Sequence, residues 1–296
     1  MINFIKKRRL WYSISLVIFL IGLFGMFNNY KQFNHFFNLG IDFTGGTSII
    51  LRFNEPVAEL ESSLRTVLNN NELEKHTIQL TGKNDVIIKT EEMTVEKRNT
   101  LFNSITSDLA TFDILEVDII GPSIGDQLRK TSIVIMLAVA IAILLYCSWR
   151  FELIFGFASI VALLHDALMV ILMSALFQIE INTAFIAALL TVLGYSINDT
   201  IVIFDRIREK FKTNDADEVS KGLLNTAVNE MLPRSIHTSV TTGIVVSSLF
   251  FFAGHSLQVF STVLLIGLIT GTYSSLFIAS PMVLTISKLK GVPVVK

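Results

Sequence analysis

The chain has 296 residues, of which 51% are hydrophobic and only 17% are charged, and its mean hydropathy is +0.59. This composition is typical of an integral membrane protein and leaves little room for a large soluble domain. A formal net charge of -1 gives no reason to expect a nucleic-acid partner. The single cysteine, Cys147, excludes an internal disulfide and a cysteine-based metal cluster.

The chain begins with a basic segment, residues 1–9, that precedes an apolar run over residues 10–28. This start resembles a signal peptide, but the run is long enough to span a bilayer and no small-residue cleavage site follows it. We therefore predict an uncleaved first transmembrane helix with its basic end in the cytoplasm.

Residues 29–130 have a soluble character. Alternating and helically spaced apolar residues predict, in order, a strand, a helix, a hairpin, a helix and a strand, over residues 39–53, 57–68, 77–88, 95–109 and 114–120. This β-α-β-β-α-β order predicts a small α+β, ferredoxin-like domain, which we expect on the periplasmic side of the membrane.

Five further apolar runs are long enough to cross a bilayer, and they lie at residues 131–148, 151–177, 183–205, 235–253 and 259–286. The short outer connections carry no lysine or arginine, whereas the inner connections are rich in both. We therefore expect an α-helical polytopic protein with six membrane helices and with both ends, residues 1–9 and 287–296, in the cytoplasm.

The inner loop over residues 206–232 has its own apolar pattern. Val219, Leu223, Ala227 and Met231 recur there at helical spacing. This spacing predicts an amphipathic helix along the membrane surface.

Asp199, between Asn198 and Thr200, lies inside the fourth apolar run. At about 1.5 Å per residue it is roughly 24 Å along a helix that starts at Thr183, within a hydrocarbon core about 30 Å thick. A carboxylate at that depth is costly, so a function and a partner are expected. The alternative is a misplaced helix boundary that leaves Asp199 at the wet interface. The apolar residues 201–204 that follow favour the functional interpretation.

Asp205 and Arg206 mark the cytoplasmic end of this helix. Arg234 is the candidate partner of Asp199, since it follows Pro233 in the expected first turn of the fifth helix, where the helix dipole disfavours a cation. The position of Arg234 is equally consistent with an arginine that simply flanks the cytoplasmic end of a membrane helix. An ion pair that opens when Asp199 is protonated would act as a switch.

His165 and Asp166 interrupt the third apolar run. In a membrane, chains of such residues build proton relays, so the pair is a candidate for the path that leads to Asp199. The alternative is a polar pair that only holds two helices together. By residue counting the pair lies nearer the outer half of the membrane, which makes a direct contact with Asp199 less expected.

The stretch GIDFTGG, residues 40–46, contains Gly40, Asp42, Gly45 and Gly46. It matches neither phosphate-binding pattern, has no basic residue and leads into a strand. Its glycines predict positive φ angles at a sharp bend, so we expect a hinge between the membrane part and the outer domain.

In the sixth run, Gly267, Gly271 and Ser275 share a helical face that would let another helix approach closely, in this chain or in a partner. The sequence contains no metalloprotease, catalytic-triad or nucleotide-binding motif. We therefore expect no enzymatic activity, no metal site and no cofactor.

Six ordered motifs resemble the SecD/SecF family of bacterial protein-export membrane proteins, within the resistance-nodulation-division (RND) superfamily. They are GIDFTGG, GPSIGDQLRK, YCSWRFE, LHDALM, GYSINDTIVIFDRIRE and PRSIHTSVTT. The match covers nearly the whole chain, although residues 54–112 match in pattern only. SecD has a larger outer region and a different glycine motif, so the chain is similar to the SecF half of the family.

The resemblance implies a bacterial inner-membrane protein in complex with SecD that acts on the SecYEG channel, with the translocating preprotein and membrane lipid as partners and YajC and YidC as further candidates. It implies that a flow of H+, or of Na+, moves the outer domain so that an emerging polypeptide is pulled or kept from sliding back. Asp199 would then be the transmembrane carboxylate and Arg234 its charged partner.

Two alternatives remain. One keeps the RND architecture and makes the chain half of a transporter for a small molecule or lipid, although the compact outer domain argues against it. The other is a structural scaffold whose buried charges only stabilise assembly.

Overall fold

The computed structural model describes residues 2–73, 75–150, 152–213 and 221–290, and it divides into two compact units. A helical unit combines the N-terminal segment up to Asn38 with the described residues from Val134 onward, and a sheet unit comprises Leu39–Ile133. Each unit has its own cluster of buried apolar side chains.

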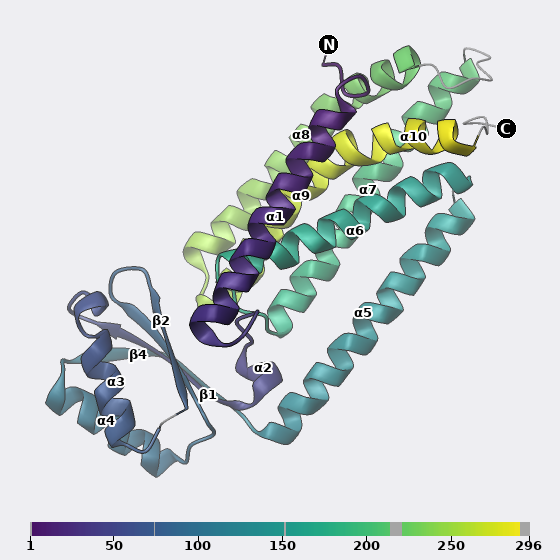
Figure 1. Cartoon of the computed structure of the whole chain (residues 1–296). Coiled ribbons are helices and arrows are strands. Elements are labelled where there is room, and N and C mark those ends of the chain that lie inside the picture. Colours follow the sequence, from purple (N-terminus) through teal and green to yellow (C-terminus); the bar gives the residue numbers. More distant parts are fainter. Residues whose placement is uncertain (1, 74, 151, 214–220, 291–296) are drawn as a thin grey trace. The chain divides into compact units, whose positions relative to one another are not determined.

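Six segments of the described chain are long and apolar enough to cross a membrane, which confirms the predicted six-helix architecture (Figure 1). The sixth is composite, because a π-helical turn, η2, separates α9 from α10. The elements are α1 (Arg8–Phe33), α5 (Pro122–Arg150), α6 (Leu153–Leu176), α7 (Thr183–Thr213), α8 (Lys221–Phe252), α9 (His255–Ser274), η2 (Ser275–Ala279) and α10 (Ser280–Lys290).

The beginning of α8 differs from the expectation. Instead of a separate surface helix followed by a span from Ser235, the structure has one continuous helix of 32 residues with Pro233 inside it. The reason is packing, since Leu224 and Val228 near its start are buried in the core of the helical unit. Arg234 therefore does not lie in a first turn, and the helix-dipole argument does not apply to it. Val219 lies outside the described residues.

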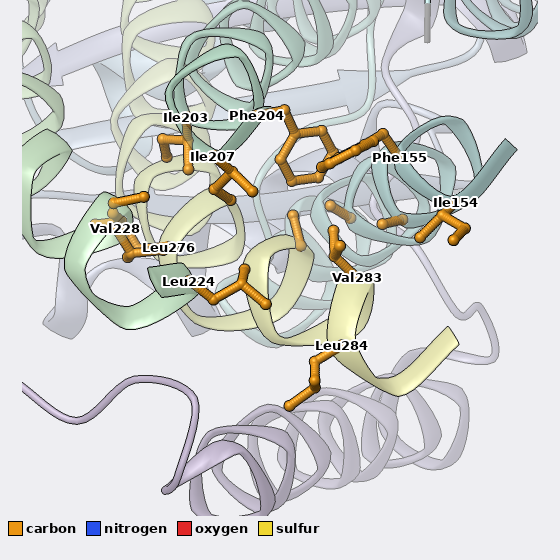
Figure 2. Close-up of a cluster of buried hydrophobic side chains, with 14 of the residues drawn as sticks. Ile154, Phe155, Ile203, Phe204, Ile207, Leu224, Val228, Leu276, Val283 and Leu284 are labelled. Carbon is orange, nitrogen blue, oxygen red and sulfur yellow. The ribbon is translucent and has the colours of Figure 1, made fainter. Parts of the chain in front are cut away.

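The core of the helical unit is formed by side chains from the segment before α1 and from α5, α6, α7, α8, η2 and α10, and Figure 2 shows part of this cluster. Phe155 of α6 packs against Phe204 of α7 with ring centroids 5.0 Å apart. Val283 and Leu284 of α10 fill the same cluster. Lipid is as apolar as these side chains, so between membrane helices they stabilise the fold through close van der Waals packing.

The segment before α1 is part of this core. Phe4 is fully buried, and the indole N–H of Trp11 donates to its carbonyl oxygen over 3.1 Å. The side-chain amides of Asn225 and Asn229 donate to the carbonyl oxygen of Ile2 over 3.0 and 2.8 Å. The N-terminal residues are thus docked on α8.

The sheet unit is a four-stranded antiparallel sheet in the order β2-β3-β1-β4, which confirms the predicted α+β, ferredoxin-like arrangement. A short helix, α2, occupies residues for which we expected strand. The elements are α2 (Ile41–Thr44), β1 (Gly46–Phe53), η1 (Val57–Glu59), α3 (Glu61–Asn70), β2 (His76–Thr81), β3 (Asp85–Thr90), α4 (Val95–Asp108) and β4 (Phe112–Ile120).

Alternation along β1 explains why the two longer helices of this unit share a core with the sheet. Ile49, Leu51 and Phe53 point to the same face because successive strand residues alternate. That face is completed by Leu64 of α3 and Leu101 of α4, both fully buried. The sheet and both helices therefore share one apolar core.

Candidate functional site

Asp199 lies in the middle of α7, and its carboxylate reaches α8. The Ser235 hydroxyl donates to Asp199 Oδ1 over 2.8 Å. Asp199 Oδ2 is buried and accepts no hydrogen bond of ordinary geometry within the described chain, although the Ser275 hydroxyl lies near the carboxylate. A buried carboxylate oxygen without such a bond is costly, so this atom is suited to bind a proton or a cation.

The structure brings Ser235, and not Arg234, to Asp199. The Arg234 side chain is exposed on α8, and no ion pair joins it to Asp199 in the part of the chain that the structure describes. Neighbouring residues on a helix point about 100° apart, so the two side chains cannot face α7 together. Arg234 still contributes to the electrostatic environment of Asp199.

The two neighbours of Asp199 lie on different sides of α7. Thr200 is buried, and its hydroxyl is 2.8 Å from the Ser275 hydroxyl of the π turn. Asn198 is exposed on the surface of the chain. Only Thr200 therefore joins Asp199 in the same polar cluster.

Asp166 of α6 is fully buried and has three donors. Its Oδ2 accepts from the hydroxyls of Ser196 (2.5 Å, α7) and Ser274 (2.6 Å, α9). Its Oδ1 lies 3.0 Å from Nδ1 of His165. No lysine or arginine of the described chain pairs with it. Hydroxyls from two other helices therefore hold this carboxylate.

His165 extends the hydrogen bonds from Asp166 to α1. Its Nε2 lies 3.0 Å from the Ser15 hydroxyl, which donates to the Tyr273 hydroxyl over 3.3 Å. Tyr273 in turn donates to the carbonyl oxygen of Trp11 over 2.7 Å. The predicted His-Asp pair is thus the centre of a chain of polar groups that links α1, α6 and α9.

The clusters around Asp166 and Asp199 meet at one turn of α7. Ser196 donates to Asp166 through its hydroxyl and accepts a hydrogen bond of 3.4 Å from Ser275 through its carbonyl oxygen. Ser275 also contacts Thr200, next to Asp199. The two carboxylates are therefore connected through serine and threonine side chains without touching one another.

The small-residue face of the sixth span packs within the chain. A Cβ added to Gly271 would lie 3.2 Å from Cβ of Ser196, and one added to Gly267 would overlap Val192. Of the two possibilities left open by the sequence, the structure has the intramolecular one. This close approach of α9 to α7 brings Ser274 and Ser275 to the carboxylates.

The residues at the far end of α7 form ion pairs. Asp205 accepts from Arg150 of α5 at 3.0 Å. Arg206 donates to Glu230 of α8 through Nε and Nη2, over 2.8 and 2.5 Å, and to Glu209 over 2.7 Å. These groups fasten α7 to α5 and α8 and lie apart from the buried carboxylates.

Two glycines of GIDFTGG have backbone angles that other residues avoid. Gly45 has φ +70° and Gly46 φ +120°, whereas Gly40 is an ordinary N-cap of α2 and Asp42 lies in its first turn. A Cβ on Gly45 would lie 3.0 Å from Cα of Pro122, and one on Gly46 would overlap the Thr90 carbonyl oxygen. Side chains are thus excluded here by both conformation and space.

Both carboxylates were predicted from the sequence, but the hydroxyl groups around them and around His165 were not. Single serines in apolar helices usually bond to the backbone of their own helix, so the sequence carries no signal that distinguishes the serines that bond to another helix. The missed residues are Ser15, Ser196, Ser235, Ser274, Ser275 and Tyr273. No group of three or more His, Cys, Asp or Glu side chains in the described ranges could hold a metal ion.

The chain matches the family model described as protein export membrane protein SecD/SecF, C-terminal, over residues 101–289, and the SecD/SecF GG motif over residues 37–57. It is 34% identical to the protein translocase subunit SecF of Sebaldella termitidis, covering 99% of this chain and 94% of that protein. It is 37% identical to the protein translocase subunit SecF of Calditerrivibrio nitroreducens, and this match covers 98% of this chain and 95% of that protein.

A solved structure, that of SecDF from Thermus thermophilus, a translocon-associated membrane protein, superposes with a TM-score of 0.83 and 33% identity. The match covers 97% of this chain but only 39% of the SecDF chain. With these matches over nearly its whole length, the chain belongs to the SecD/SecF family of protein-export membrane proteins.

Proposed function

We propose that the chain acts as the SecF-type subunit of a complex with SecD, and that movement of a cation through the helical unit drives its contribution to polypeptide export by SecYEG. The observation that carries this proposal is the buried Oδ2 of Asp199, which accepts no hydrogen bond of ordinary geometry within the described chain. A charge in hydrocarbon is tolerated where it binds an ion or a proton in turn.

The topology we propose has both chain ends in the cytoplasm of a bacterial inner membrane and the sheet unit in the periplasm. The basic residues of the predicted inner loops support it. The preprotein would then meet the sheet unit after it leaves the channel. YajC and YidC remain candidate partners on resemblance alone.

In this proposal the uncharged and charged forms of Asp199 stabilise different arrangements of α7 and α8. Ser235 joins the two helices through Asp199, and Arg234 lies near enough to affect its charge. Entry of a cation neutralises the carboxylate and weakens its attraction for both groups. Asp166, with His165, would serve as the second site on the same path.

The sheet unit would respond through GIDFTGG. Gly45 packs against Pro122 at the start of α5, so α2 and the beginning of the second span are held together at one point. We propose that this point is the hinge. A change in the helical unit would then reach the sheet unit through the two chain segments that flank this hinge.

The test is translocation of a secreted precursor into membrane vesicles after ATP has been removed. With Asp199→Asn, we expect the cation-driven completion of translocation to be lost while the complex with SecD still assembles. The matched control is Thr191→Val on the same helix, because Thr191 is exposed and its hydroxyl bonds only to the carbonyl oxygen of Ala187.

Loss of assembly in Asp199→Asn would favour the scaffold instead, and wild-type completion would reject cation coupling through Asp199. Repeating the assay at a fixed membrane potential with and without sodium distinguishes H+ from Na+ as the coupling ion.

A further inference from the structure

The sixth span changes its helical geometry beside the two carboxylates. The α-helix α9 ends at Ser274, the π turn covers Ser275–Ala279, and α10 begins at Ser280. A π turn holds an extra residue relative to an α-helical turn, is rare, and is found frequently at functional sites. Its position beside the two carboxylates indicates a role in addition to crossing the membrane.

The residues at the start of the turn reach both clusters. Ser274 donates to Asp166 over 2.6 Å, while Ser275 contacts Thr200 at 2.8 Å and lies beside Asp199. Both serines are fully buried. Since successive helix positions point about 100° apart, two adjacent residues can serve two sites on neighbouring helices.

A third serine stabilises the wide turn. The Ser280 hydroxyl, fully buried at the start of α10, donates to the carbonyl oxygen of Ser275 over 2.9 Å. This bond spans five residues, as the hydrogen bonds of a π-helix do. It therefore connects the two ends of the turn directly.

The other side of the turn is held in place by packing. A Cβ added to Gly267 would overlap Val192 of α7, and one added to Gly271 would lie 3.2 Å from Cβ of Ser196, so α9 packs tightly on α7. α9 is thus restrained against α7 beside the carboxylates, so an adjustment in the turn is more easily taken up on the side of α10. A packed element with two discrete geometries can pass on a small local change.

We propose that Ser274, Ser275 and Ser280 are positioning residues that tie the carboxylates of Asp166 and Asp199 to the π turn, so that a change of charge at either one alters the turn and moves α10. This inference rests on the proposed cation coupling. Within the described chain, the titratable groups near the two carboxylates are His165 of α6, which contacts Asp166, Tyr273 of α9, which stacks on His165, and Arg234 of α8, whose charge acts on Asp199.

The first test is a double-mutant cycle on export after ATP removal, with the full chain in its complex. Ser274→Ala removes a hydrogen bond to a charged acceptor and should slow export by roughly tenfold or more. In an Asp166→Asn background, the same substitution should add nothing further. Ser274→Thr, which keeps the hydroxyl, should restore export.

The matched control is Ser261→Ala in the same span. Ser261 is also fully buried, but its hydroxyl bonds only to the carbonyl oxygen of Leu257 in its own helix. We expect wild-type export from it. Ser280→Ala should slow export although it touches neither carboxylate.

A second readout does not depend on export. In thermal unfolding of the purified complex, the shifts in Tm of Ser274→Ala and Asp166→Asn should be non-additive, as expected for residues in one hydrogen-bond network. If Asp166→Asn and Asp199→Asn both export normally, the cation-coupling proposal fails. The thermal cycle still tests the contact between Ser274 and Asp166. The inference would be overturned if Ser274→Ala and Asp166→Asn reduced export by factors that multiply in the double variant. Wild-type export by Ser280→Ala would also overturn it.

Discussion

The Ser235 hydroxyl donates a hydrogen bond of 2.8 Å to Asp199 and so joins α8 to α7 in the middle of two membrane spans. The bond satisfies one carboxylate oxygen and leaves the other without a hydrogen bond of ordinary geometry in the described chain. A site that is half satisfied can respond to an incoming cation, because binding completes its coordination.

Replacing Ser235 with Ala should lower both stability and export. The loss of a hydrogen bond to a charged acceptor costs about 1.5–3 kcal/mol. Thermal unfolding of the purified complex measures this loss. Ser248→Ala is the control on the same helix, since its exposed hydroxyl bonds only to Ile244. Equal melting temperatures for the two variants would contradict the importance of the contact.

Both carboxylates could be found from the sequence because charge inside an apolar run is costly and therefore stands out. The order of strands and helices in the sheet unit was likewise predicted from the apolar patterns between residues 39 and 120. Ser235 and Ser274 could not be found, because a serine that bonds to another helix has the same local sequence signal as one that bonds to its own, such as Ser261.

The helix start predicted near Pro233 was wrong for a related reason. Proline favours the first turn of a helix, and it followed a polar segment, so a helix start was the natural expectation. The buried contacts of Leu224 and Val228 continue the helix across it. Tertiary packing of this kind outweighs local preference, and it cannot be read from spacing alone.

Replacing Gly45 or Gly46 with Val should impair export without preventing membrane insertion. Either substitution forces a β-branched side chain into a positive φ and against Pro122 or Thr90. Gly82→Val is the matched control, since Gly82 has φ +67° but open space where a Cβ would lie. Precursor translocation measures the effect, and unchanged export in both hinge variants would remove the hinge from the account.

Truncating Phe4 should destabilise the helical unit by about 3–5 kcal/mol, the usual cost of removing a buried phenylalanine. Phe4 is fully buried against Phe277, with ring centroids 5.0 Å apart. Phe24→Ala, at a side chain that is 72% exposed, should have a much smaller effect. A melting temperature unchanged by Phe4→Ala would show that the N-terminal segment is not docked.

Acid should weaken the start of α4. The backbone N–H of Glu96, and then the Thr94 hydroxyl, hold the pKa of the Glu96 carboxyl below its usual value. A lowered folded-state pKa adds stability above the unfolded pKa, and that stability is lost as the pH falls through the folded pKa. The protection of the α4 amides against hydrogen exchange, relative to their intrinsic exchange rate at each pH, should therefore fall in acid, and Glu96→Gln should reduce this dependence. The exposed Glu55→Gln is the control, and identical acid profiles for the two variants would contradict the prediction.

The most direct test of cation coupling is the flow of the ion itself. Vesicles containing the purified complex with SecD are given an imposed proton gradient, or a sodium gradient, and its decay is followed with an ion-sensitive dye. We predict that the wild-type complex accelerates the decay of one of these gradients and that Asp199→Asn abolishes the acceleration while the complex remains assembled. Equal decay through the wild-type and Asp199→Asn complexes, for both ions, would contradict the account.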